Sequence, residues 1–154
     1  MEKIEVKKVI NPSKEILDIT SKWMFDWWGR KKHYDYDAVY YYMKYSFNDK
    51  KLPQTYALFL NNKIIGMYQI TYNDLFIRPD IYPWIANLYI DKKYRNKGYG
   101  KILINSIKEM TANNTNFKEI FLYTHHVNLY EKFGWKFVSS TEIKGENLYK
   151  FDLY

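Results

Sequence analysis

The residues with the clearest chemical potential form one short basic stretch: Arg95, Asn96, Lys97, Gly98, Tyr99, Gly100 and Lys101. They follow an apolar, β-prone run at 84–91 and precede a segment with apolar residues at helical spacing. The first turn of a helix presents unpaired backbone N–H groups and the positive end of the helix dipole, which together bind phosphate. Glycines let the backbone approach a ligand closely. Residues 95–101 are therefore predicted to bind a diphosphate.

Two common phosphate-binding motifs do not fit this stretch. A P-loop requires Ser or Thr after its lysine, but Lys101 is followed by Ile102. A dinucleotide-binding fingerprint requires a third glycine three residues after Gly100, where the chain has Leu103. The remaining pattern, Arg-x-x-Gly-x-Gly after a strand, resembles the acetyl-CoA loop of the GCN5-related N-acetyltransferase (GNAT) superfamily. For this motif alone, a basic helix cap without any ligand is the structural alternative.

A second motif occurs at 129–135, which reads Leu-Tyr-Glu-Lys-Phe-Gly-Trp. It resembles the Leu-Tyr-x-x-x-Gly-Phe signature found late in GNAT enzymes, and the resemblance implies acyl transfer from acetyl-CoA to a primary amine. Tyr130 is then expected to act as the general acid toward the leaving thiolate, because a phenol has a pKa near ~10 and a thiol near ~8.5. The alternative is that Tyr130 only packs, since the chain contains 17 Tyr.

The general base is less clearly indicated. The strand at 84–91 has no carboxylate before Asp91, and Asn87 can orient a water molecule but cannot take its proton. The candidates are Asp74 and Asp80 in the preceding loop and the pair His125 and His126 after strand 119–124. A polar strand end is the structural alternative for the histidines. Adjacent histidines in a chain without cysteine do not predict a metal site.

The elements that must position these groups follow from the apolar periodicity. Strands are predicted at 3–10, 55–60, 63–71, 84–91, 119–124, 135–138 and 147–153, and helices at 13–29, 35–47, 102–113 and 127–133. This order, βααβββαβαββ, predicts an α/β fold with a mixed sheet and helices on both faces. It is also the element order of the GNAT fold, over a single domain of residues 1–154.

The resemblance gives the two motifs a common location. It implies that strands 84–91 and 119–124 are parallel neighbours that splay apart, with the pantetheine arm pairing with the backbone of Leu88, Tyr89 and Ile90 in the gap. The resemblance also implies that a backbone N–H near Tyr89 or Ile90 stabilises the developing charge on the thioester oxygen. The acceptor is expected to contact Trp28, Tyr72, Asp74, Trp84 and His125. The sequence shows no dense acidic wall of the kind that a polycationic aminoglycoside would favour.

Composition limits the remaining function classes. The chain is 47% hydrophobic and 27% charged, and its net charge of +7 favours anionic partners such as coenzyme A, nucleic acid or anionic membranes. No apolar run is long enough for a membrane span, and no signal peptide or cysteine is present, so we expect a cytoplasmic protein without membrane attachment. The cations are spread along the chain and match no nucleic-acid motif, so nucleic acid is a disfavoured partner.

The function predicted from these observations is transfer of the acetyl group of acetyl-CoA to a primary amine of a small molecule or peptide. The partners are acetyl-CoA as co-substrate and the amine acceptor, without a metal, and a homodimer is left open. One alternative is a GNAT-like domain that binds acyl-CoA with little turnover, which the missing strand carboxylate motivates. Another is acetylation of an amine carried on RNA.

Overall fold

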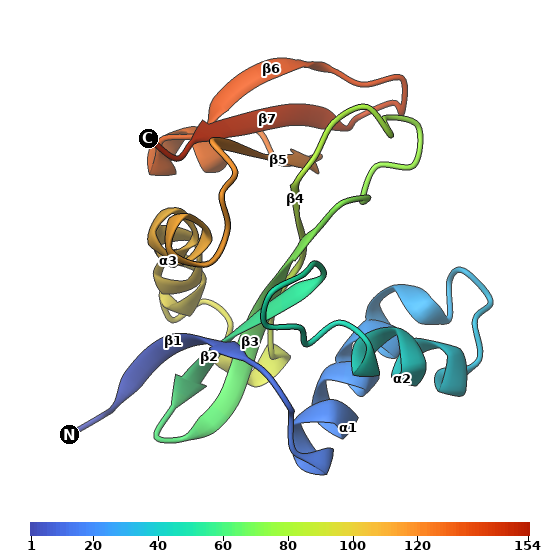
Figure 1. Ribbon diagram of the computed structural model, residues 1–154, viewed down its shortest axis with the longest axis vertical. Coiled ribbons are helices and arrows are strands. Elements are labelled where there is room, and N and C mark those ends of the chain that lie inside the picture. The colour runs from blue at the N-terminus through green and yellow to red at the C-terminus, as the bar shows by residue number, and fades with distance from the viewer.

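A seven-stranded sheet with the order β1-β2-β3-β4-β5-β7-β6 runs through the computed structural model, which describes all 154 residues (Figure 1). All neighbouring strands are antiparallel except β4 and β5, which are parallel. The predicted mixed sheet of an α/β fold is therefore confirmed. The strands are β1 (Ile4–Val9), β2 (Gln54–Leu60), β3 (Lys63–Thr71), β4 (Trp84–Ile90), β5 (Glu119–Thr124), β6 (Lys136–Ser140) and β7 (Asn147–Asp152).

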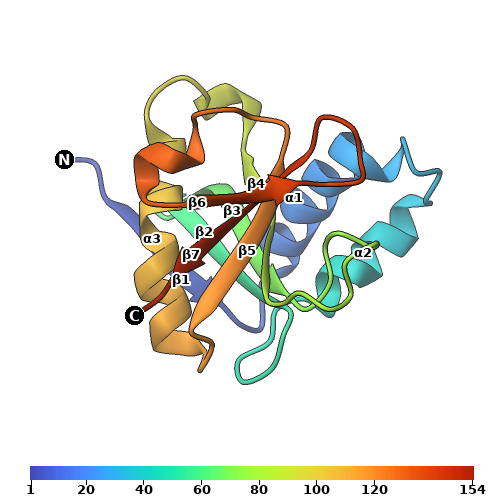
Figure 2. The same ribbon diagram turned by 90° about the horizontal axis from the view of Figure 1, so that it is seen from above.

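Three α-helices cover the two faces of the sheet: α1 (Lys14–Met24), α2 (Tyr36–Lys44) and α3 (Tyr99–Asn114). Both views place α3 on one face and α1 with α2 on the other (Figures 1 and 2). Ser13 caps α1 by accepting the backbone N–H of Ile16 at 3.2 Å. No helix combines the length and apolar character needed to cross a bilayer.

The helix predicted at 35–47 ends at Lys44 and the one predicted at 102–113 begins at Tyr99, and two other helices differ in type or length. The first predicted helix reaches Gly29, but α1 ends at Met24 and continues as a π-helical turn over Phe25–Gly29. The predicted helix at 127–133 is only a 3₁₀ turn at Tyr130–Phe133. Val127 is 68% exposed, so no tertiary packing stabilises an additional first turn. Gly134, with φ 89°, ends the segment in the left-handed conformation.

Alternating residues of the central strands build two hydrophobic cores, one on each face. On β2, Tyr56 and Leu58 belong to the cluster that includes Ile107 of α3, whereas Ala57 and Phe59 belong to the cluster formed with α1 and α2. This alternation is the period of two expected for a strand buried on both faces. The central strands of the sheet, including β4, are therefore covered by helices on both faces.

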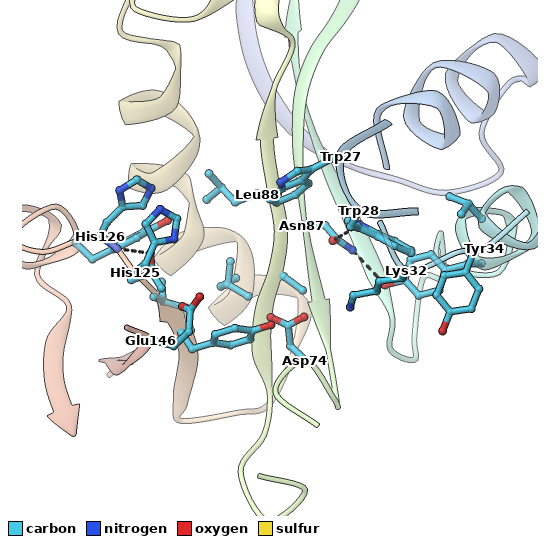
Figure 3. Close-up of a pocket in the computed structure, with 18 of the residues that line it drawn as sticks. Trp27, Trp28, Lys32, Tyr34, Asp74, Asn87, Leu88, His125, His126 and Glu146 are labelled. Carbon is cyan, nitrogen blue, oxygen red and sulfur yellow. Dashed lines mark hydrogen bonds between the residues drawn. The ribbon is translucent and has the colours of Figure 1, made fainter. Parts of the chain in front are cut away.

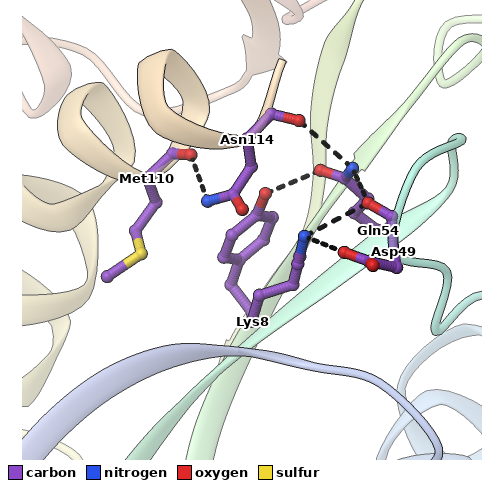
Figure 4. Close-up of polar contacts among 6 residues, drawn as sticks. Lys8, Asp49, Gln54, Met110 and Asn114 are labelled. Carbon is purple, nitrogen blue, oxygen red and sulfur yellow. Dashed lines mark hydrogen bonds and ion pairs between the residues drawn. The ribbon is translucent and has the colours of Figure 1, made fainter.

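A group of polar contacts fixes the start of β2 against the end of α3 (Figure 4). The Gln54 side-chain amide donates to the carbonyl oxygens of Asp49 at 2.9 Å and of Asn114 at 3.4 Å. Its carbonyl oxygen accepts the Tyr56 hydroxyl at 2.6 Å, and Lys8 forms an ion pair with Asp49 at 2.6 Å. Because Gln54 is buried, satisfying both ends of its amide removes a desolvation cost of about 1–3 kcal/mol.

The sheet separates between its two parallel strands. Trp84 and Phe121 are the single register pair of β4 and β5, and beside it the backbone N–H of Phe121 donates to the Pro83 carbonyl oxygen at 3.0 Å. Beyond this point the facing edges of the two strands carry no ladder. The predicted divergence of strands 84–91 and 119–124 is therefore confirmed, and it leaves unpaired backbone groups along β4.

A β-bulge on the other edge of β4 contributes to this divergence. The register with β3 shifts so that Asn87 and Leu88 together lie opposite Tyr68, and Asn87 has φ 53°. A bulge of this kind bends its strand and increases the local twist. The sequence gives no local signal for the bulge, because asparagine is common at positive φ but is equally at home in turns.

Candidate active site

A cavity of about 710 Å³ opens where β4 and β5 diverge (Figure 3). Residues 85–88 of β4 line one side, and residues 122–126, from β5 and the turn after it, line the other. The π-helical turn and α2 extend the wall with aromatic side chains, and Asp74 and Glu146 reach it from two loops. The cavity thus joins segments that are far apart in the sequence, with mixed aromatic and charged walls.

The glycine-rich stretch lies between the end of β4 and the start of α3. Gly98 has φ 88° and is the N-cap of α3, and no side chain caps the helix there. A Cβ atom built at Gly98 or Gly100 meets no other atom within 4 Å. The first N–H groups of α3 are therefore uncapped and border open space, which is the local condition for holding an anion.

Arg95 differs from the two lysines of this stretch because its guanidinium contacts the protein itself. Its Nε donates to the Ile90 carbonyl oxygen at 2.8 Å, and its guanidinium lies 4.9 Å from the ring centroid of Tyr89. These contacts fix the loop to the end of β4. Lys97 and Lys101 are exposed and add positive charge to the same region.

Residues 88–90, which are predicted to pair with pantetheine, present mainly backbone groups to the gap between β4 and β5. The Leu88 side chain lines the cavity. Tyr89 is buried, and its ring packs against Trp23 at 5.3 Å and Trp27 at 5.5 Å, so the side chain does not face the gap. Ile90 packs against the core on the α3 side. Contact of these residues with a coenzyme stays a prediction.

Tyr130 lies in the cavity wall at the start of the 3₁₀ turn. Its ring packs against Trp135 at 6.1 Å and Tyr149 at 6.3 Å, whereas its hydroxyl forms no hydrogen bond within the protein. Burial raises the pKa of Tyr130 above that of a free phenol. The hydroxyl therefore stays protonated at neutral pH and is free to donate to a group in the cavity.

A hydrogen-bond network holds the β4 bulge from the acceptor side. The Trp28 indole N–H donates to the Asn87 side-chain oxygen at 3.1 Å. The Asn87 amide donates to the Gln69 side-chain oxygen at 2.7 Å and to the Tyr42 hydroxyl at 3.1 Å. Gln69 is fully buried and in turn donates to Thr55 at 3.1 Å. Asn87 therefore uses both ends of its amide within the protein, which leaves it a structural role at the bulge.

Two carboxylates reach the cavity, and only one was a sequence candidate. Asp74 is partly buried and has no hydrogen-bond or ion-pair partner, and loss of hydration raises its pKa to about 7 although Lys32 nearby opposes the rise. Glu146 comes from the loop between β6 and β7, where no motif marks it. Burial raises the pKa of Tyr123 to about 12, and the charges of Asp74 and Glu146 add to that rise.

Of the three other candidates for the general base, two line the cavity and one does not. His125 and His126 line the cavity at the end of β5, with ring centroids 4.4 Å apart. Asp80 lies outside the cavity, is exposed, and forms an ion pair with Arg78 at 2.8 Å. The described side chains form no group of three or more His, Cys, Asp or Glu residues that could hold a metal ion.

Two residues predicted to contact the acceptor lie elsewhere. Trp84 is fully buried in a cluster with Leu75 and Leu148, and its indole N–H donates to the Ile81 carbonyl oxygen at 2.7 Å. Tyr72 packs edge-on against the rings of Tyr82 and Phe117, away from the cavity. Their aromatic side chains are used in packing, so these two predictions are corrected, whereas Trp28, Asp74 and His125 do line the cavity.

Comparison with known proteins agrees with this architecture. The chain matches a Bacillus subtilis subsp. natto protein named "Probable spermine N(1)-acetyltransferase" at 30% identity over 70 residues, which is 42% of this chain and 46% of the relative. A spermine/spermidine N(1)-acetyltransferase of B. subtilis strain 168 matches at 29% identity over the same shares. The match thus spans about half the length of these curated relatives.

The fold is shared with a solved structure, an aminoglycoside 6′-N-acetyltransferase complexed with coenzyme A. It superposes with a TM-score of 0.74 at 13% identity, over 97% of both chains. The family model described as "Acetyltransferase (GNAT) family" matches residues 14–135. The resemblance predicted from the two motifs is confirmed, and the chain belongs to the GNAT family of acetyltransferases.

Proposed function

We propose that this protein is an N-acetyltransferase that moves the acetyl group of acetyl-CoA directly to a primary amine of a small molecule. One observation carries the proposal: β4 and β5 diverge after a single register pair, and the cavity that Leu88 and Tyr130 line lies where they diverge. The uncapped start of α3 follows the end of the same strand, β4. A coenzyme whose diphosphate and thioester are joined by an extended arm would use both positions.

The coenzyme would be held mainly by backbone groups. The N–H groups at the start of α3, with Lys97 and Lys101 beside them, would bind the diphosphate. The unpaired edge of β4 would pair with the amides of the arm as an added strand. A backbone N–H near Leu88 would then donate to the thioester oxygen as negative charge develops on it.

Starting from an ammonium, the nitrogen must lose two protons, one before attack and one from the tetrahedral species, and the leaving sulfur must gain one. The neutral amine attacks the carbonyl carbon, a C–N bond forms, the C–S bond breaks, and the amide and free coenzyme A thiol are the products. Tyr130 would donate its proton to the leaving sulfur and would be reprotonated by the proton that the nitrogen of the tetrahedral species releases. His125 and His126 lie at the end of β5 and would accept the proton that an ammonium substrate must lose, since imidazole suits this task near neutral pH.

The acceptor is proposed to be a cationic aliphatic amine. The cavity combines the rings of Trp28 and Tyr42 with the carboxylates of Asp74 and Glu146, which suits an alkylammonium through apolar contact, cation–π attraction and charge. The names of the B. subtilis relatives support the same class, since they refer to spermine and spermidine.

A second candidate function is binding of acyl-CoA with little turnover. It is favoured by the lack of a carboxylate on β4 facing the cavity and by the complete hydrogen bonding of Asn87.

The two functions are separated by measuring release of coenzyme A thiol from acetyl-CoA with a panel of primary amines. We expect amine-dependent release by the wild type and a large loss in Tyr130→Phe. Tight coenzyme binding without amine-dependent release for any amine would favour the binding function.

A further inference from the structure

The end of the cavity away from Leu88 is acidic (Figure 3). Asp74 projects into it from the loop between β3 and β4, and Glu146 from the loop between β6 and β7. The two carboxylates come from opposite sides of the gap, yet both act electrostatically on the hydroxyl of Tyr123, which also lines the cavity. They therefore share one region of the cavity, distant from the strand segment expected to hold the thioester.

Asp74 is partly buried in the cavity wall, and loss of hydration disfavours its charged form. No hydrogen bond or ion pair reaches it, and the cation that acts on it, Lys32, does not form an ion pair with it. Most buried carboxylates of stable proteins are paired, since an unpaired one carries a desolvation cost. A carboxylate left unpaired inside a cavity is a site for a cationic group from outside.

The side chain of Lys32 indicates which chemical group suits the acidic end of the cavity. Its ammonium lies 5.7 Å from the ring centroid of Trp28 and within electrostatic range of Asp74. The protein thus already places an alkylammonium beside an aromatic face and a carboxylate in this cavity. The side chain of Lys32 is exposed and flexible enough to be displaced by a ligand that carries the same group.

We propose that Asp74 and Glu146 form a subsite for the second, non-reacting ammonium of a linear diamine or polyamine. This inference rests on the proposed function, because it takes the reacting amine to lie near Leu88. The part of β4 that lines the cavity runs from Ile85 to Leu88, about 10 Å at the usual rise of a strand. A flexible aliphatic chain with amines at both ends spans such a length, whereas a monoamine fills only one end.

The test is equilibrium binding, so that it does not depend on turnover. Calorimetry in the presence of coenzyme A compares α,ω-diaminoalkanes of increasing length with the n-alkyl monoamine of the same carbon count. We expect the wild type to bind the longer diamines at least about tenfold more tightly than their matched monoamines. Asp74→Asn and Glu146→Gln should each remove about tenfold of diamine affinity and change monoamine affinity less than about twofold.

Matched controls come from the same two loops. Asp80→Asn and Glu142→Gln remove exposed carboxylates that do not line the cavity, and both should leave the preference for diamines intact. Equal affinity for diamines and monoamines in the wild type would overturn the subsite, as would equal effects of the cavity and control substitutions. Diamine binding without thiol release would instead support the subsite and count against catalysis, so the two failures are distinguishable.

Discussion

The indole N–H of Trp28 donates to the side chain of Asn87 at 3.1 Å, across 59 positions of sequence. This contact joins the π-helical turn of the acceptor wall to the bulge of β4, the strand expected to hold the thioester. Trp28→Phe keeps most of the ring but leaves the Asn87 oxygen without its donor. We expect a loss of about 1 kcal/mol in the free energy of unfolding, and a kcat reduced several-fold with KM for acetyl-CoA little changed.

Trp27→Phe is the matched control for stability, because the Trp27 N–H makes no hydrogen bond and the ring contact with Tyr89 is largely kept. Chemical denaturation of both variants, together with initial rates, measures the difference. If the two substitutions cost the same stability and rate, the hydrogen bond between Trp28 and Asn87 does not hold the bulge in place.

Gly98 is predicted to be required for coenzyme binding rather than for folding alone. At φ 88°, alanine introduces backbone strain of about 1 kcal/mol, and Gly98→Ala should lower stability modestly. Gly98→Asp adds a negative charge where the diphosphate is proposed to bind, so KM for acetyl-CoA should rise at least about tenfold. Gly145→Asp is the control, because Gly145 has φ 85° and open space but lies in the loop between β6 and β7. Equal KM values for the two Asp variants would contradict the role of the loop.

Tyr130→Phe tests the donor at the leaving sulfur. We expect kcat to fall by about 100-fold, with KM for acetyl-CoA and the melting temperature nearly unchanged, because the hydroxyl has no partner within the protein. Tyr149→Phe is a neighbouring control that loses only a 3.3 Å hydrogen bond to Glu131. A Tyr130→Phe enzyme with the wild-type kcat would show that the residue contributes packing alone.

Asp74 should make the protein less stable as the pH rises. Its pKa is raised from 3.8 to about 7, so between these values the folded state keeps a proton that the unfolded state releases. Stability then falls with rising pH across this window and stays reduced above about pH 7. Asp74→Asn should melt a few degrees higher than the wild type at pH 8 and at the same temperature near pH 4. Thermal denaturation across the window measures this, and parallel curves for the two proteins would contradict the expectation.

The fold and the glycine-rich turn before α3 were predictable because their signals are local. Gly98 and Gly134 mark left-handed helix ends, and the apolar periodicity of β2 and β3 identifies strands without knowledge of their neighbours. The divergence of β4 from β5 followed from the family resemblance, not from the residues of either strand. The extent of the last helix was overestimated because periodicity does not reveal whether Val127 finds a packing partner.

The acceptor side was predicted less completely because its contacts are long-range. Glu146 lines the cavity because of the course of the loop between β6 and β7. The Tyr42 hydroxyl accepts a hydrogen bond from Asn87, which lies in the bulge of β4. Trp84 and Tyr72 were expected in the cavity as aromatic residues near it. The side on which each ring packs depends on the exact course of the loop at 72–83, which no pattern in its own residues encodes.

The single backbone pair between β4 and β5 divides the sheet into two units that share almost no ladder. What joins them is side-chain packing: one buried cluster contains Leu103, Ile104 and Ile107 of α3 together with residues of β2, β3, β5 and β7. The width of the gap is therefore set by the packing of this cluster rather than by hydrogen bonds between strands. Trimming a methyl group from the cluster would alter how the two halves of the sheet sit relative to each other while every strand kept its own partners.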